Sequence, residues 1–217
     1  DSRHIVEMRQ LLQDYNKLLE KPFIDIQSLD TPRIELPEKK RRRLSNEQFF
    51  VNITHHDKFV RRVFNNNSFT DGGRFYGGWW QRIDGNFRKS IRMNNIATVE
   101  IDYSSLHVVL AYTEAGLDYW KKTEKDPYDL PVRGVNNPEH SRDIVKLFFL
   151  LSLNASTEQS LFKAFRYQFS YKEHPYSFPD DVLSELLATI KEHHPDIADL
   201  ICSGAGLRLM NIDSRIC

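Results

Sequence analysis

Asp102 is the first side chain whose place in the sequence suggests chemistry. It follows Val99 and Ile101, two β-branched residues in an alternating pattern, so residues 97–102 predict a β-strand that ends at this carboxylate. An acid at the end of a strand is well placed to hold a hard cation such as Mg²⁺, which takes oxygen ligands and often shares them with substrate phosphates. The alternative is that Asp102 serves only as an acid near a helix N-terminus.

A pair of cations forms the second candidate group. Arg142 and Lys146 are four residues apart and open the apolar stretch 147–153. On a helix this spacing places both side chains on one face. A guanidinium fork and an ammonium point charge on the same face suit a triphosphate. The alternative is a solvated Arg/Lys pair on an amphipathic helix, which is very common.

A glycine-rich segment, residues 71–80, precedes both groups and carries Arg74 among aromatic residues. Glycines allow close approach of the backbone to a ligand, and aromatic rings can stack on bases. The alternative is a β-turn whose aromatic side chains enter the core. The aromatic residues are Phe75, Tyr76, Trp79 and Trp80.

Taken in order, these three segments resemble three motifs of single-subunit polymerases. Residues 71–80 resemble the DxxGR-type motif of phage-type RNA polymerases, the segment around Asp102 resembles motif A, and the Arg142 segment resembles motif B. Asp102-Tyr103-Ser104 followed by Leu106 is also similar to motif A of DNA polymerase I-like (family A) enzymes. The resemblance extends over residues 65–160.

The resemblance implies a template-dependent nucleotidyltransferase, a DNA or RNA polymerase-like enzyme that uses two-metal phosphoryl transfer. Its implied partners are a nucleic acid template and primer and nucleoside triphosphates, and its implied cofactor is Mg²⁺ or Mn²⁺. Asp102 and Lys146 are the implied catalytic residues, with Lys146 touching the triphosphate and protonating the leaving group. The further implied contacts are metal binding by Asp102 and the carbonyl of Tyr103, nucleotide binding by Tyr103, His107, Arg142, Lys146 and Asn154, and nucleic-acid binding by Gly73, Arg74 and Tyr76.

The sequence departs from the family pattern at two positions that bear on sugar selection. His107 stands where DNA polymerase I-like enzymes carry a glutamate that screens the sugar, and it is equally a histidine packed on the inner face of its helix. Asn154 stands where polymerases usually carry a tyrosine followed by glycine. The choice between ribose and deoxyribose is therefore open.

A second catalytic carboxylate, expected after a histidine on a hairpin downstream of motif B, has no obvious counterpart. His55-His56-Asp57 precedes motif A, and Asp213 lies in a segment, residues 207–216, that predicts a helix. We therefore expect the 217 residues to be a fragment that lacks polymerase activity alone, with the second carboxylate beyond residue 217.

Composition limits the classes of protein to which the chain can belong. The formal net charge is zero, so positive charge must be concentrated locally, above all in residues 39–43. Two cysteines, Cys202 and Cys217, are too few for a disulfide framework and suggest a reducing cytoplasm. No apolar run is long enough to span a bilayer, and no membrane partner is expected.

The patterning along the chain predicts an α+β fold that is mostly helical, with a small antiparallel palm-like sheet and a helical fingers-like part. A helix and basic connector over residues 1–45 precede a polymerase-like core over residues 46–217. The predicted elements are helices over 5–21, 46–64, 106–116, 162–171, 180–193 and 207–216, a hairpin over 86–102 with its turn at 94–95, and further helices on both sides of residues 134–138.

Two other functions stay open. The chain can be a catalytically inactive, polymerase-like nucleic-acid-binding module of a larger replication or defence protein. It can also be an unrelated helical interaction protein with chance motif matches. Further domains or partner proteins are compatible with the first alternative.

Overall fold

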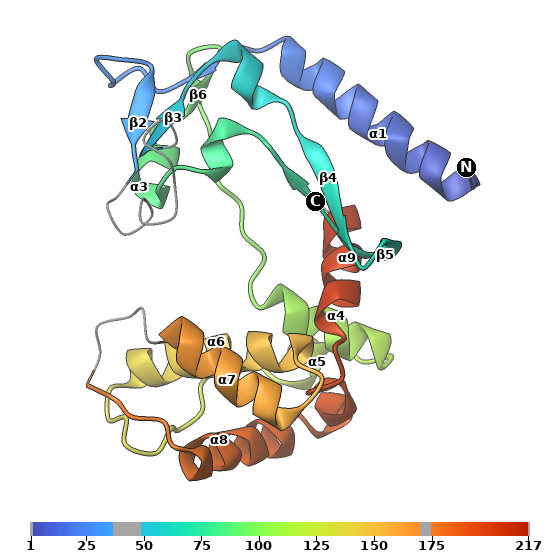
Figure 1. Cartoon of the computed structure of the whole chain (residues 1–217), viewed down its shortest axis with the longest axis vertical. Coiled ribbons are helices and arrows are strands. Elements are labelled where there is room, and N and C mark those ends of the chain that lie inside the picture. Colours follow the sequence, from blue (N-terminus) through green and yellow to red (C-terminus); the bar gives the residue numbers. More distant parts are fainter. Residues whose placement is uncertain (1, 37–48, 170–174, 217) are drawn as a thin grey trace. The chain divides into compact units, whose positions relative to one another are not determined.

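The computed structural model describes residues 2–36, 49–169 and 175–216 (Figure 1). The described chain is mostly helical with small antiparallel sheets, which confirms the predicted α+β class. It divides into two compact units, Asp1–Phe64 with Gly73–Asp102, and Asn65–Gly72 with Tyr103–Cys217. The predicted domain boundary at residue 45 and the basic run 39–43 lie outside the described residues.

The first unit combines one long helix with short antiparallel strands. Its strands pair as β1–β6–β7 and β2–β3, and β4 pairs with β5 in a hairpin that continues into the second unit. The elements are α1 (Arg3–Glu20), β1 (Ile24–Asp25), β2 (Arg33–Glu35), β3 (Phe50–Asn52), η2 (His55–Lys58), β4 (Arg61–Asn65), β5 (Ser68–Tyr76), η3 (Trp79–Gln81), α3 (Gly85–Arg88), β6 (Arg92–Met93) and β7 (Ile96–Ala97).

Local sequence signals explain several of these elements. Helix α1 follows the predicted apolar spacing and ends just before Pro22, which cannot continue a helix. Asn94 and Asn95 adopt φ of +50° and +67°, so they form the predicted two-residue turn that joins β6 to β7. Met93 pairs with Ile96 beside this turn.

The predicted strand over residues 97–102 is wrong. Strand β7 ends at Ala97, and residues 98–103 have no regular secondary structure. Val99 and Ile101 are 84% and 81% exposed. β-Branched residues favour strands because they fit a half-buried pleated surface, and no described strand provides that surface here.

The predicted helix over residues 46–64 is also wrong. Its described part holds β3, the single turn η2 and β4. The residues of β4 alternate between exposed and half-buried, which is the periodicity of a strand. The signal that was missed is Asn66-Asn67, which adopts φ of +52° at both residues and turns β4 back into β5.

Trp79 is the largest side chain in the small core of the first unit, and it is 1% exposed. Apolar residues from β2, β3 and the flanking loops surround it. The buried members of this first core are Ile26, Ile34, Leu36, Val51, Ile53, Trp79, Ile83 and Ile91.

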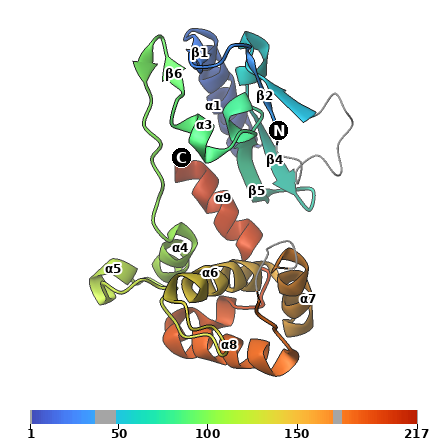
Figure 2. The ribbon, with the colours of Figure 1, turned by 90° about the vertical axis from the view of Figure 1, so that its left-hand side faces the viewer.

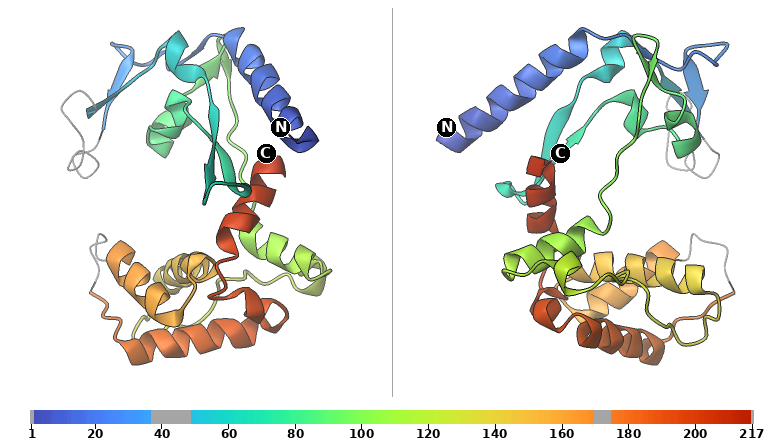
Figure 3. Two further views of the ribbon diagram at one scale, coloured as in Figure 1. Left: turned by 45° about the vertical axis from the view of Figure 1, so that its right-hand side comes forward. Right: turned by 180° about the vertical axis from the view of Figure 1, so that it is seen from behind.

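The second unit is helical, and its helices agree with the predicted segments. Figure 2 and Figure 3 show α6, α7 and α8 as neighbouring helices and α9 beside α4. Asn137 caps α6 by accepting a hydrogen bond from the backbone N–H of His140, and Pro138 follows at the first helical position. The helices are α4 (Leu106–Glu114), α5 (Tyr119–Lys122), α6 (Pro138–Asn154), α7 (Glu158–Phe169), α8 (Asp180–His193), η4 (Pro195–Leu200) and α9 (Gly206–Ile216).

One continuous hydrophobic core joins these helices. Phe148 and Phe149 of α6 are fully buried, as are Leu161 and Phe165 of α7. The ring of Phe148 meets that of Phe165 edge-on, with centroids 5.2 Å apart. Among the described helices, none is long and apolar enough to cross a membrane.

Candidate functional site

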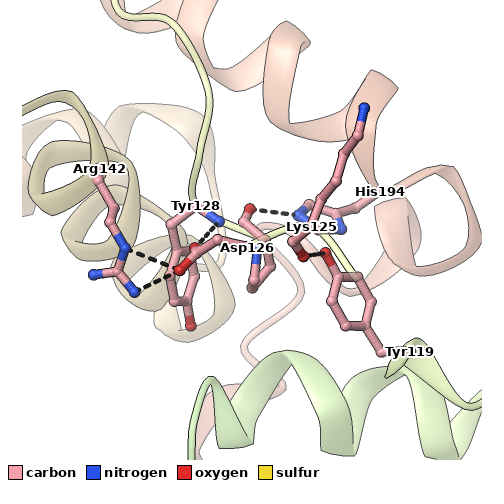
Figure 4. A network of polar contacts seen from close by, with 7 residues as sticks. Tyr119, Lys125, Asp126, Tyr128, Arg142 and His194 are labelled. Atoms are coloured by element: carbon pink, nitrogen blue, oxygen red, sulfur yellow. Dashed lines mark hydrogen bonds and ion pairs between the residues drawn. The ribbon is translucent and has the colours of Figure 1, made fainter. Parts of the chain in front are cut away.

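The best-defined polar cluster of the second unit lies where the loop before α6 meets that helix (Figure 4). Arg142 donates from Nε and Nη2 to Oδ2 of Asp126, at 3.0 and 2.7 Å. The hydrogen bonds to the Asp126 carboxylate raise the pKa of the Arg142 guanidinium, so its charge is permanent. Arg142 is therefore held in one orientation on α6.

Tyr128 lies beside this ion pair and near the start of α4. Its backbone N–H donates to Oδ1 of Asp126 at 2.8 Å, and the guanidinium carbon of Arg142 lies 5.8 Å from its ring centroid. Burial raises the pKa of this phenol to about 12, and the nearby Ser105 side chain opposes that shift. The tyrosine thus stays neutral and lies between the N-cap residue of α4 and the first half of α6.

Buried rings support the loop from its other side (Figure 4). His194 is fully buried, its Nε2 lies 3.0 Å from the carbonyl oxygen of Pro127, and its Nδ1 lies 3.1 Å from the hydroxyl of Tyr112. Burial lowers the pKa of His194 to about 4, so the ring is neutral, with Nε2–H donating to Pro127 and Nδ1 accepting from Tyr112. Tyr119 donates from its hydroxyl to the carbonyl oxygen of Lys125 at 2.9 Å.

Lys146 lies one turn after Arg142 on α6, as predicted, and its side chain is exposed. It has neither an ion pair nor a hydrogen bond to any residue that the structure describes. Its ammonium is therefore available to an anion, whereas the Nε and Nη2 edge of Arg142 is already occupied by Asp126.

Asp102 and Tyr103 occupy the irregular segment that precedes α4. Asp102 is the last residue of the first unit, and its side chain is exposed rather than fixed at a strand end. Tyr103, the first residue of this part of the second unit, is half exposed. Ser105 occupies the predicted N-cap position but has φ of +54°, and its hydroxyl makes no capping bond. Such a backbone is strained for a residue with a side chain.

The two residues that bear on sugar selection have different surroundings. His107 is half-buried in the first turn of α4. Asn154 ends α6 and donates from Nδ2 to the carbonyl oxygen of Leu150 at 2.8 Å. A Cβ atom at Gly206 would clash with the side-chain amide of Asn154, so the amide packs against the first residue of α9. Asn154 therefore has a packing role in this fold.

The glycine-rich segment forms strand β5 and the turn after it. Gly73 accepts a hydrogen bond at its carbonyl oxygen from Nε of Arg62, at 2.7 Å. The guanidinium of Arg62 lies 5.3 Å from the ring centroid of Phe75. Arg74 is half-buried and Tyr76 is 43% exposed.

Trp79 cannot stack on a base in this fold. Its side chain lies in the core of the first unit, as the alternative interpretation of the aromatic residues predicted. Tyr76 is the exposed ring of this segment.

Among the described residues, no group of three or more His, Cys, Asp or Glu side chains is arranged to hold a metal ion. Asp102 offers a single exposed carboxylate, and a two-metal centre needs at least one further acid. The late acid Asp213 is buried on α9.

Sequence reasoning missed the three residues that organise the cluster, Asp126, Tyr128 and His194. In the sequence, the Asp126-Pro127 pair by itself indicates only a break between helices. Aspartate often accepts a hydrogen bond from the backbone N–H two residues later and so forms a turn. Asp126 does this with the backbone N–H of Tyr128, and the bond fixes the orientation of its carboxylate. Asp126 and Arg142 are too far apart in the sequence for a local pattern to predict their ion pair.

No protein-family model matches this chain. The curated proteins and the solved structures likewise contain no significant match.

Proposed function

We propose that this chain is the nucleotide-handling part of a template-dependent nucleotidyltransferase of the single-subunit polymerase type. The observation that supports it most is the position of Tyr128, which lies near Ser105 at the start of α4 and beside Arg142 on α6. The motif A-like and motif B-like segments are far apart in the sequence, and a polymerase needs them to act on one triphosphate. Their joining within the second unit is what this proposal requires.

The cations of α6 suit the chemistry. Phosphoryl transfer depends mainly on positioning and on stabilising the charge that builds on the transferred and leaving groups. Arg142 presents a rigid guanidinium and Lys146 an exposed ammonium one turn away. In the proposed role, both bind the triphosphate and Lys146 gives a proton to the leaving pyrophosphate.

Asp102 is the proposed acidic partner. It precedes Ser105 by three residues, so its Cα lies within about 11 Å of the Ser105 Cα whatever the conformation of the segment. Its carboxylate and the carbonyl of Tyr103 are oxygen ligands of the kind that Mg²⁺ shares with substrate phosphates. On nucleic acid, the proposed contacts are Arg74 and the exposed ring of Tyr76.

Nucleotide binding to the 217-residue chain tests the proposal. Titration calorimetry with each nucleoside triphosphate and Mg²⁺ should detect binding, and Lys146→Ala should weaken it by about tenfold, since one charge-assisted contact is lost. Lys163→Ala is the matched control, because Lys163 is an exposed lysine of the neighbouring helix α7.

If both lysine variants weakened binding equally, the effect would come from the overall charge of the protein and not from a specific contact of Lys146. Absence of binding by the unsubstituted chain to every triphosphate would overturn the proposed function.

A further inference from the structure

We infer that Asp126 is a positioning residue for nucleotide, which holds Arg142 so that the Nη1 side of the guanidinium faces the phosphates. This inference rests on the proposed function. It assigns a role to an acid whose position in the sequence, sixteen residues before Arg142, gives no hint of it.

The geometry of the pair leaves one side of the guanidinium available. Nε and Nη2 of Arg142 both donate to the same oxygen of Asp126, at 3.0 and 2.7 Å. Nη1 makes no hydrogen bond with any residue that the structure describes. A guanidinium has five N–H donors in a fixed plane, so fixing Nε and Nη2 also fixes the direction of Nη1.

Asp126 is itself fixed, which is what a positioning residue requires. Its second oxygen, Oδ1, accepts the backbone N–H of Tyr128 at 2.8 Å. The peptide between these two residues is anchored by His194, which donates to the carbonyl oxygen of Pro127 at 3.0 Å. The ring of Tyr128 lies under the guanidinium, with its centroid 5.8 Å from the guanidinium carbon. Little rotational freedom remains for Arg142.

The charge of Asp126 makes the inference sharply testable. A carboxylate beside a triphosphate repels it, so removing the negative charge should tighten binding if Asp126 had no other role. If Asp126 instead holds the guanidinium in place, its removal should weaken binding in spite of the more favourable charge. The sign of the change therefore separates the two effects.

Asp126→Asn is the variant of choice. The asparagine keeps an oxygen for the backbone N–H of Tyr128, so the turn is preserved. The guanidinium of Arg142 loses its negatively charged partner. We expect the affinity for nucleoside triphosphate with Mg²⁺ to fall about fivefold, which corresponds to one hydrogen bond. Asp118→Asn is the charge-matched control, because Asp118 also accepts backbone N–H groups, at the start of α5, and does not contact Arg142.

A double variant shows whether the effect passes through Arg142. In the Arg142→Lys background the planar fork is absent, so adding Asp126→Asn should not weaken binding further. Circular dichroism and the thermal unfolding midpoint establish that each variant is folded.

Each outcome has a distinct meaning. Unchanged or tighter binding by folded Asp126→Asn, or an equal further loss in the Arg142→Lys background, overturns the positioning role and leaves the proposed function intact. Failure of the unsubstituted chain to bind any triphosphate overturns the proposed function and this inference with it.

Discussion

The two units of this chain are built with very different cores. In the second unit, fully buried rings and aliphatic side chains from α4, α6, α7, α8 and α9 form one continuous cluster. In the first unit, the buried cluster is small and centres on Trp79. The difference indicates that apolar burial dominates the stability of the helical unit, while the strand-containing unit depends more on specific polar contacts.

Buried titratable groups show the same contrast. In the first unit, Lys58 is 1% exposed, and its Nζ donates to the carbonyl oxygens of Glu20 and Pro22, both at 2.8 Å. Burial lowers the pKa of this ammonium. In the second unit, His194 is buried as a neutral ring between an acceptor and a donor. The first unit therefore uses a buried lysine as a donor to the backbone, and the second keeps a buried histidine neutral.

The comparison of cores is tested most strongly by Phe148→Ala. Removing this fully buried ring should lower the free energy of unfolding of the second unit by about 3–5 kcal/mol, because it leaves a cavity beside Phe165. Hydrogen exchange should show lost protection in α6 and α7. Tyr167→Ala, at a 53% exposed position of α7, is the control and should have little effect. A small effect of Phe148→Ala would contradict the assignment of this core.

The neutrality of His194 predicts a dependence of stability on pH. Its pKa is about 4 in the folded chain against an ordinary value of 6.5, so the unfolded chain binds more protons between these values. The contribution of His194 to the free energy of unfolding is complete above pH 6.5 and is lost as the pH falls toward 4. The total loss is about 3 kcal/mol.

Denaturant unfolding of the unsubstituted chain and of His194→Gln, at pH 7 and pH 4, measures this contribution. The difference in unfolding free energy between the two proteins should shrink at pH 4. Tyr112→Phe keeps His194 buried and should retain most of the pH dependence, since desolvation is the largest cause of the shift. A constant difference between pH 7 and pH 4 would show that His194 is not excluded from water.

Lys58→Met tests the role of polar contacts in the first unit. Methionine keeps the length of the stem but leaves the carbonyl oxygens of Glu20 and Pro22 without their donor. The expected loss in unfolding free energy is about 1–3 kcal/mol, as for an unpaired buried polar group. Chemical denaturation followed by tryptophan fluorescence measures it, and Lys89→Met at an exposed position is the control. A gain in stability would mean that desolvation of the ammonium outweighs its two hydrogen bonds.

The sequence by itself determined the helices of the second unit. Apolar residues at helical spacing predicted α6, α8 and α9, because each of these helices buries an apolar face in the core. It also located the Asn94-Asn95 turn, which depends only on two residues that tolerate positive φ. The one-face placement of Arg142 and Lys146 followed from the helix alone.

Only the tertiary structure decided the strands and the polar cluster. Residues 98–102 have the composition of a strand, yet a strand needs a partner, and local sequence does not record whether one is present. The choice of Asp126 as the partner of Arg142, and of Pro127 as the acceptor for His194, depends on how α4, α6 and α8 pack. Contacts between residues far apart in sequence leave no periodic signal, so they emerge only when the core has brought the helices together.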